Sequence, residues 1–163
     1  MSKHKELQII NPTIRKPTFL WAVLVVLMAS LVAGCAGSST PESEHDFAMA
    51  SLDAMPIDMR SAPDRARQAY QLSAGNPDIF IQIPCYCGCS AMGHTSNYDC
   101  YVSGANGDGT LTYDPHALVC TLCVDITHDT VRLLKQGQSL PEVREYIDAN
   151  YSKYGPGTGA WFR

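Results

Sequence analysis

Six of the seven cysteines in this 163-residue sequence lie between Cys85 and Cys123. Three alternate in the string Pro84-Cys85-Tyr86-Cys87-Gly88-Cys89, Cys100 follows, and Cys120 and Cys123 form a C-x-x-C pair. Thiolates bind soft or borderline metal ions, and thiols also form or exchange disulfides. The spacing therefore indicates sulfur chemistry, and three interpretations compete.

Metal binding is the first interpretation. Alternating cysteines present several sulfurs to one side, and Gly88 permits a tight turn between them. A helix starting near Leu118 would bring Cys120 and Cys123 one turn apart, and the dipole at its N-terminus favours thiolates. The candidate ligands are Cys85, Cys87, Cys89, Cys100, Cys120 and Cys123, with His94 and His116 as auxiliary ligands or groups that support the ligands.

Six thiolates and two imidazoles would fill two tetrahedral Zn²⁺ sites or a compact multinuclear Cu(I) cluster. A thioether from Met92 would add to the preference for Cu(I). We therefore expect Cu(I) first and Zn²⁺ second as the bound metal. The spacing matches no ferredoxin pattern, so we do not expect an iron–sulfur cluster.

The alternatives are a scaffold of three disulfides, favoured by an even six cysteines in an exported chain, and thiol–disulfide exchange at Cys120 and Cys123. Neighbours two residues apart rarely meet the geometry of a disulfide, and no βαβ pattern flanks the C-x-x-C pair. The sequence shows no catalytic triad, phosphate loop or carboxylate pair, so we expect a binding protein rather than an enzyme.

The N-terminus has the pattern of an export signal. A basic segment precedes an uncharged apolar run over residues 19–34, which is short for a helix that needs about 20 residues to span a bilayer. The tetrapeptide Val32-Ala33-Gly34-Cys35 resembles the lipobox of bacterial lipoproteins, and this resemblance implies a lipid on Cys35. We expect a signal peptide at 1–34, a lipidated N-terminus and flexible tether at 35–62, and an extracytoplasmic location on a bacterial membrane.

The net negative charge of residues 35–163 argues against nucleic acid as a partner. Residues 35–163 carry eight basic and fifteen acidic side chains. An acidic chain of this kind is a poor ligand for nucleic acid, because binding there depends on neutralising phosphates. The expected partners are the membrane, through Cys35, and a protein that donates or accepts metal.

The remaining residues, 63–163, are predicted to form a mainly α domain of three to four helices with a cysteine-rich irregular loop. Asp64 is expected to cap a helix to about Leu72, and a short helical turn follows Pro77. Residues 103–115 predict a loop or small hairpin. An apolar periodicity predicts a helix over 118–136 that ends at Gly137, and Ser139 and Glu142 form the capping box of the next helix.

Two resemblances extend this interpretation. From about Pro77 to Tyr154 the chain resembles the PCYCGC-motif family of bacterial lipoproteins, through the PCYCGC string, Gly93-His94, Asp114-Pro115-His116-Ala117 and Cys120-x-x-Cys123. This implies a lipidated, cysteine-rich surface protein. Residues 120–155 are more weakly similar to the thiol-bearing subunit of bacterial cytochrome c maturation, which implies a three-helix domain with a working cysteine pair. Val119 stands where that family has Arg.

Overall fold

The computed structural model describes residues 46–159. The expected signal peptide, residues 35–45 of the expected tether and the predicted lipidation site Cys35 lie outside the described residues. Within the described part, no helix is both long enough and apolar enough to cross a bilayer.

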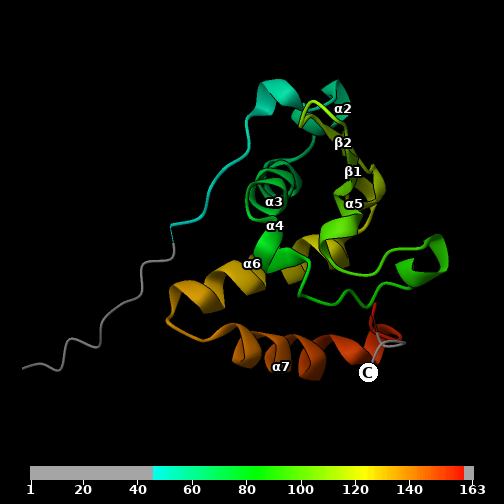
Figure 1. Cartoon of the computed structure of the whole chain (residues 1–163). Coiled ribbons are helices and arrows are strands. Elements are labelled where there is room, and N and C mark those ends of the chain that lie inside the picture. The colour runs from blue at the N-terminus through cyan, green and yellow to red at the C-terminus, as the bar shows by residue number, and fades with distance from the viewer. Residues whose placement is uncertain (1–45, 160–163) are drawn as a thin grey trace, which may run out of the picture. The chain divides into compact units, whose positions relative to one another are not determined.

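Three helices of more than ten residues form the framework: α3 (Asp64–Gly75), α6 (Thr121–Lys135) and α7 (Leu140–Tyr151). α6 packs against both of the others and lies between them (Figure 1). Its buried face carries Cys123, Thr127, Val131 and Leu134 at helical spacing, as the sequence periodicity predicts. The predicted mainly α domain is confirmed.

The connection between α6 and α7 forms as expected. Gly137 has φ +83°, and its N–H and that of Gln138 donate to the carbonyls of Leu134 and Leu133, which closes the end of α6. At the start of α7 the Glu142 carboxylate accepts bonds from the backbone N–H and the hydroxyl of Ser139 at 2.7 and 2.6 Å. The turn of the helical hairpin is therefore set by local hydrogen bonds that the sequence predicts.

Two helix boundaries differ from the prediction. The N-cap of α3 is Pro63 rather than Asp64, and the helix continues to Gly75 instead of stopping near Leu72. The predicted single helix over 118–136 is divided into α5 (His116–Val119) and α6, because the backbone of Cys120 is extended at φ −114°, ψ 94°. This break places Cys120 at the N-cap of α6.

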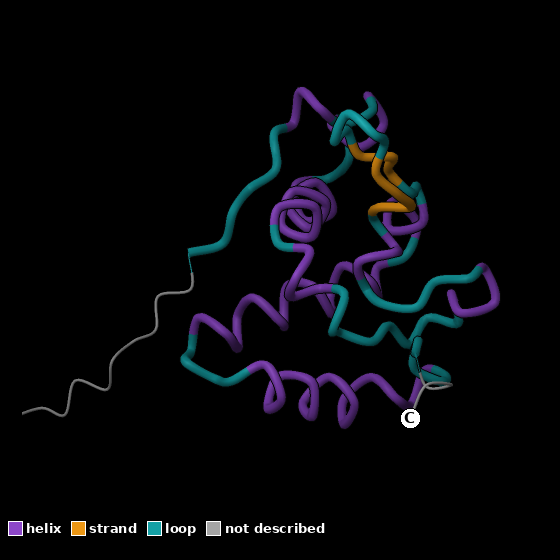
Figure 2. The backbone as a smooth tube through the Cα atoms, viewed as in Figure 1, coloured by secondary structure: helices purple, strands orange, loops and turns teal. Residues whose placement is uncertain are grey.

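Shorter elements complete the domain. α2 (Ile57–Arg60) and α4 (Pro77–Phe80) flank α3, and the second is the helical turn expected after Pro77. The predicted hairpin is also present, because β1 (Val102–Ala105) and β2 (Leu111–Tyr113) pair antiparallel with a bulge after Val102. Figure 2 shows the loop between α4 and β1, which carries four of the cysteines, as mostly irregular backbone with short helical turns.

The core joins all three long helices. Its largest fully buried side chains include Tyr70, Phe80, Tyr101, Ile126 and Ile147. Tyr70 meets Tyr101 edge to face, with the ring centroids 5.0 Å apart. Phe47, Met55 and Met59, which fall in the segment expected to be a tether, are also buried in this core.

Candidate metal centre

The cysteine loop is held against α7 and the C-terminal segment. The backbone N–H of Cys85 donates to the Thr158 hydroxyl at 2.7 Å, and the N–H of Thr158 donates to the carbonyl of Cys85 at 2.8 Å. The Tyr86 hydroxyl donates to the Asp148 carboxylate. Gly88, with φ +84°, then turns the chain so that Cys87 and Cys89 both face inward, as the glycine predicts.

The second group of ligands comes from the region between β2 and α6. His116 is the first residue of α5, and its N–H donates to the Asp114 carboxylate at 2.8 Å. Cys120 and Cys123 lie at the N-cap and in the first turn of α6, where the helix dipole stabilises thiolates. The extended backbone at Cys120 therefore places its thiol at the N-terminus of α6, beside Cys123.

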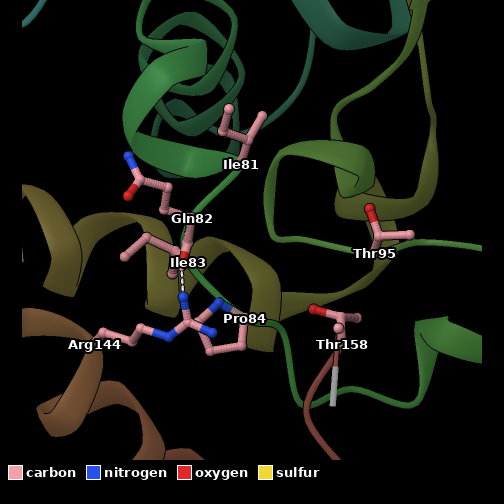
Figure 3. A pocket seen from close by; sticks show the side chains of 8 residues that line it. Ile81, Gln82, Ile83, Pro84, Thr95, Arg144 and Thr158 are labelled. Carbon is pink, nitrogen blue, oxygen red and sulfur yellow. Dashed lines mark hydrogen bonds between the residues drawn. The ribbon is translucent and has the colours of Figure 1, made fainter. Parts of the chain in front are cut away.

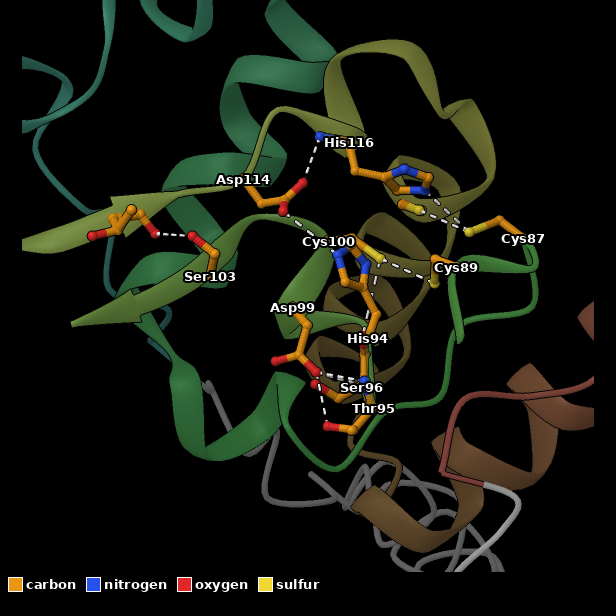
Figure 4. Close-up of polar contacts among 12 residues, drawn as sticks. Cys87, Cys89, His94, Thr95, Ser96, Asp99, Cys100, Ser103, Asp114 and His116 are labelled. Atoms are coloured by element: carbon orange, nitrogen blue, oxygen red, sulfur yellow. Dashed lines mark hydrogen bonds and ion pairs between the residues drawn. The ribbon is translucent and has the colours of Figure 1, made fainter. Parts of the chain in front are cut away.

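The two groups converge. The sulfur of Cys123 lies 3.4 Å from that of Cys85, 3.6 Å from that of Cys87 and 3.2 Å from that of Cys120. Cys87 also contacts Nε2 of His116 at 3.3 Å (Figure 4). All six cysteines of the described residues are free thiols.

Three overlapping sets have ligand atoms within 4.8 Å of one another. They combine the six predicted cysteines with His116, and Cys87 belongs to all of them. The sets are Cys85, Cys87, Cys100 and Cys123; Cys87, Cys89, Cys100 and His116; and Cys87, His116, Cys120 and Cys123. His94 lies outside all three sets, and Met92 is 57% exposed.

The spacing suits metal ligands. A Zn–S bond of about 2.3 Å places the sulfurs of a regular tetrahedron about 3.8 Å apart, whereas a disulfide joins its sulfurs at about 2.05 Å. The Cys87–Cys123 and Cys89–Cys100 pairs are both 3.6 Å apart, which is close to the tetrahedral edge. For these two pairs an ion would require sulfur movements of only a few tenths of an ångström.

Hydrogen bonds among the clustered thiols lower the pKa of some cysteines and raise that of others. Hydrogen bonds from the thiols of Cys100 and Cys123 lower the pKa of Cys85 to about 4. Hydrogen bonds from Cys100 and Cys120 hold the pKa of Cys87 well below its usual range. The pKa of Cys100 is raised, because it donates to Cys123 and Cys85 and because it is buried. Thiolate character is thus concentrated at Cys85 and Cys87, where a cation would be attracted.

A buried polar network behind the site was not predicted from the sequence. The Asn97 side chain donates to the carbonyl of Cys123 at 3.2 Å and accepts from the Thr127 hydroxyl at 2.8 Å. The Tyr101 hydroxyl lies 2.7 Å from that of Thr127. This network joins the cysteine loop to the first turn of α6. In the sequence, the one indication of it is that Thr127 falls on the same helix face as Cys123.

A cavity of about 360 Å³ lies beside the motif but does not contain the site. Its lining includes Pro84, Thr95, Arg144 and Thr158, with no cysteine or histidine (Figure 3). Arg144 donates to the carbonyl of Gln82 at 3.0 Å and so already has a partner.

Comparison with known proteins gives one family match. A family model described as a protein of unknown function with PCYCGC motif matches residues 24–160. Neither a curated protein nor a solved structure gave a match. The family match confirms the resemblance carried by the PCYCGC string, and it contains no statement about lipidation or cytochrome c maturation.

Proposed function

The chain belongs to the family of proteins with the PCYCGC motif, whose function is unknown, and we propose that it holds and delivers a soft metal ion outside the cytoplasm. Cu(I) is the first candidate and Zn²⁺ the second. In this proposal, a lipid on Cys35 anchors the protein to a bacterial membrane, and the thiolate cluster provides the metal site.

One observation carries the proposal. Cys87, His116, Cys120 and Cys123 come from two distant segments, and their ligand atoms lie within 4.8 Å of one another. Three thiolates and one imidazole form a donor set that tetrahedral Zn²⁺ accepts, and the excess of thiolates around it favours Cu(I).

The burial pattern is consistent with transfer of the ion. Cys85, Cys100 and Cys123 are fully buried, whereas Cys87 and Cys120 are partly exposed. A partner's thiolate can therefore reach the ion from the side of Cys87 and Cys120 while the buried sulfurs still hold it. Val119 next to Cys120 is 87% exposed, which leaves this side uncovered within the described residues.

Anaerobic purification followed by elemental analysis and thiol titration tests the proposal. We expect bound metal, together with six thiols that titrate after denaturation with a chelator. Cys87→Ser is expected to lose most of the metal, because Cys87 belongs to every candidate set. His128→Gln is the control, because the hydrogen bond of the His128 ring goes to the carbonyl of Arg65 and not to a candidate ligand. A reduced, folded chain that binds neither Cu(I) nor Zn²⁺ would overturn the proposal.

Thiol–disulfide exchange is the second candidate function. Its supporting observation is the 3.2 Å separation of the sulfurs of Cys120 and Cys123 at the start of α6. This function predicts a reversible two-electron couple that Cys123→Ser abolishes, and it predicts no bound metal. The alternative of a disulfide scaffold predicts that no thiols titrate in the denatured, unreduced protein.

A further inference from the structure

His94 contains a buried nitrogen without a hydrogen-bond partner. Its side chain is 10% exposed, and its Nδ1 atom accepts and donates no bond. The other ring nitrogen, Nε2, lies 3.5 Å from the Asp114 carboxylate. Buried polar atoms are nearly always paired, because an unpaired one costs about 1–3 kcal/mol. An unpaired lone pair at this position therefore points to a ligand that would occupy it.

The surroundings identify the kind of ligand. Figure 4 shows the His94 ring between the Asp114 carboxylate and the thiol of Cys100. The ring meets that of His116 edge to face at 5.4 Å, and His116 itself lies within 4.8 Å of the sulfurs of Cys89 and Cys100. A histidine that binds a metal through one nitrogen commonly directs the other toward a carboxylate, as Nε2 of His94 does.

The sulfurs that remain after the first set are grouped around Cys100, while Cys85 and Cys89 share none of the three sets. When Cys87, His116, Cys120 and Cys123 hold one ion, three cysteines remain, all of them at most 1% exposed. The sulfur of Cys100 is 3.6 Å from that of Cys89 and within 4.8 Å of that of Cys85. Cys100 is thus the common neighbour of the two others.

We propose that Cys85, Cys89, Cys100 and Nδ1 of His94 form a second metal position, so that each chain holds two adjacent ions. This inference rests on the proposed function and extends it from one ion to two. Each position then has three thiolates and one imidazole. Asp114 faces Nε2 of His94 and also accepts from the backbone N–H of His116, so it connects the segments that carry the two histidines. The sulfurs of Cys85 and Cys87, 3.4 Å apart, bring the two positions into contact.

Titration of the reduced chain with Co²⁺ tests this proposal, because Co²⁺ takes tetrahedral sites and its absorption reports bound thiolates. Native mass spectrometry counts the ions. We expect two Co²⁺ per chain in the unmodified protein and in the His128→Gln control. In His94→Ala we expect the affinity for the second ion to fall about tenfold or more, with the first retained. Cys120→Ser should weaken the other position.

The outcomes separate the two proposals. A limit of one Co²⁺ in the unmodified chain overturns the second position but leaves the proposed function intact. No bound Co²⁺ overturns both. Two ions bound with unchanged affinity and spectrum in His94→Ala would remove His94 from the site. His94→Gln, which keeps a polar group toward Asp114 but offers no ring nitrogen, should show the same loss as His94→Ala if the alanine variant folds poorly.

Discussion

Replacing Asn97 by alanine is expected to destabilise the domain markedly. Asn97 is fully buried, and its side chain makes two hydrogen bonds, to the carbonyl of Cys123 and from the hydroxyl of Thr127. Each buried bond contributes about 0.5–1.5 kcal/mol, and the truncated side chain leaves a small void as well. The expected loss in the free energy of unfolding is therefore about 2–3 kcal/mol. Thr127 keeps its contact with Tyr101, which limits the loss.

Chemical denaturation of the metal-free, reduced protein measures this loss. Asn106→Ala is the matched control, because Asn106 lies exposed in the hairpin and, among the described residues, its side chain bonds only to the hydroxyl of Thr110. We expect that control to change the free energy of unfolding by less than about 0.5 kcal/mol. Equal denaturation midpoints for Asn97→Ala and Asn106→Ala would refute the assignment of the buried network as the link between the loop and α6.

Three further predictions concern the rest of the domain. Gly75→Ala should destabilise the protein by about 1–3 kcal/mol in a denaturation assay, because an added Cβ would clash with the backbone oxygen of Ala48. Gly107→Ala, where nothing lies within 4 Å, should change little. Burial raises the pKa of Tyr70 and Tyr151. The stability that these phenols contribute is therefore complete below their unfolded pKa of about 10 and is lost as the pH rises above it, where denaturation midpoints should fall. Removing the metal with a chelator should lower the thermal midpoint by about 10 °C when the free ion had been about a hundredfold above its dissociation constant, and no shift would contradict binding to the folded state.

Local signals made much of the framework predictable. Gly137 and the Ser139–Glu142 capping box act within one turn of chain, so residue type alone determines how α6 ends and α7 begins. The spacing of Cys123, Thr127, Val131 and Leu134 likewise predicts which face of α6 is buried. The hairpin follows from its glycine, asparagine and aspartate content.

The structural features that the sequence did not predict depend on tertiary contacts. The division between α5 and α6 at Cys120 has no glycine or proline to mark it, and the extended backbone there serves the cysteine cluster instead of local propensity. Phe47 and Met59 sit among prolines without a helical period, so their burial against the core could not be read from the sequence pattern.

The sequence suggests which residues belong to the candidate metal site but not how they are arranged. Cysteine and histidine are conspicuous by type, and the sequence places them in one region. Which sulfurs meet depends on how the irregular loop folds over α6, and this is fixed by distant contacts such as those between Cys85 and Thr158. The support of both histidines by Asp114 depends on the same fold.

X-ray absorption spectroscopy of the reduced protein loaded with one equivalent of Zn²⁺ tests the central claim most directly. We predict a first shell of three sulfurs at about 2.3 Å and one nitrogen at about 2.0 Å. A shell made only of oxygen and nitrogen would contradict the claim that thiolates from the loop and from α6 bind one ion together.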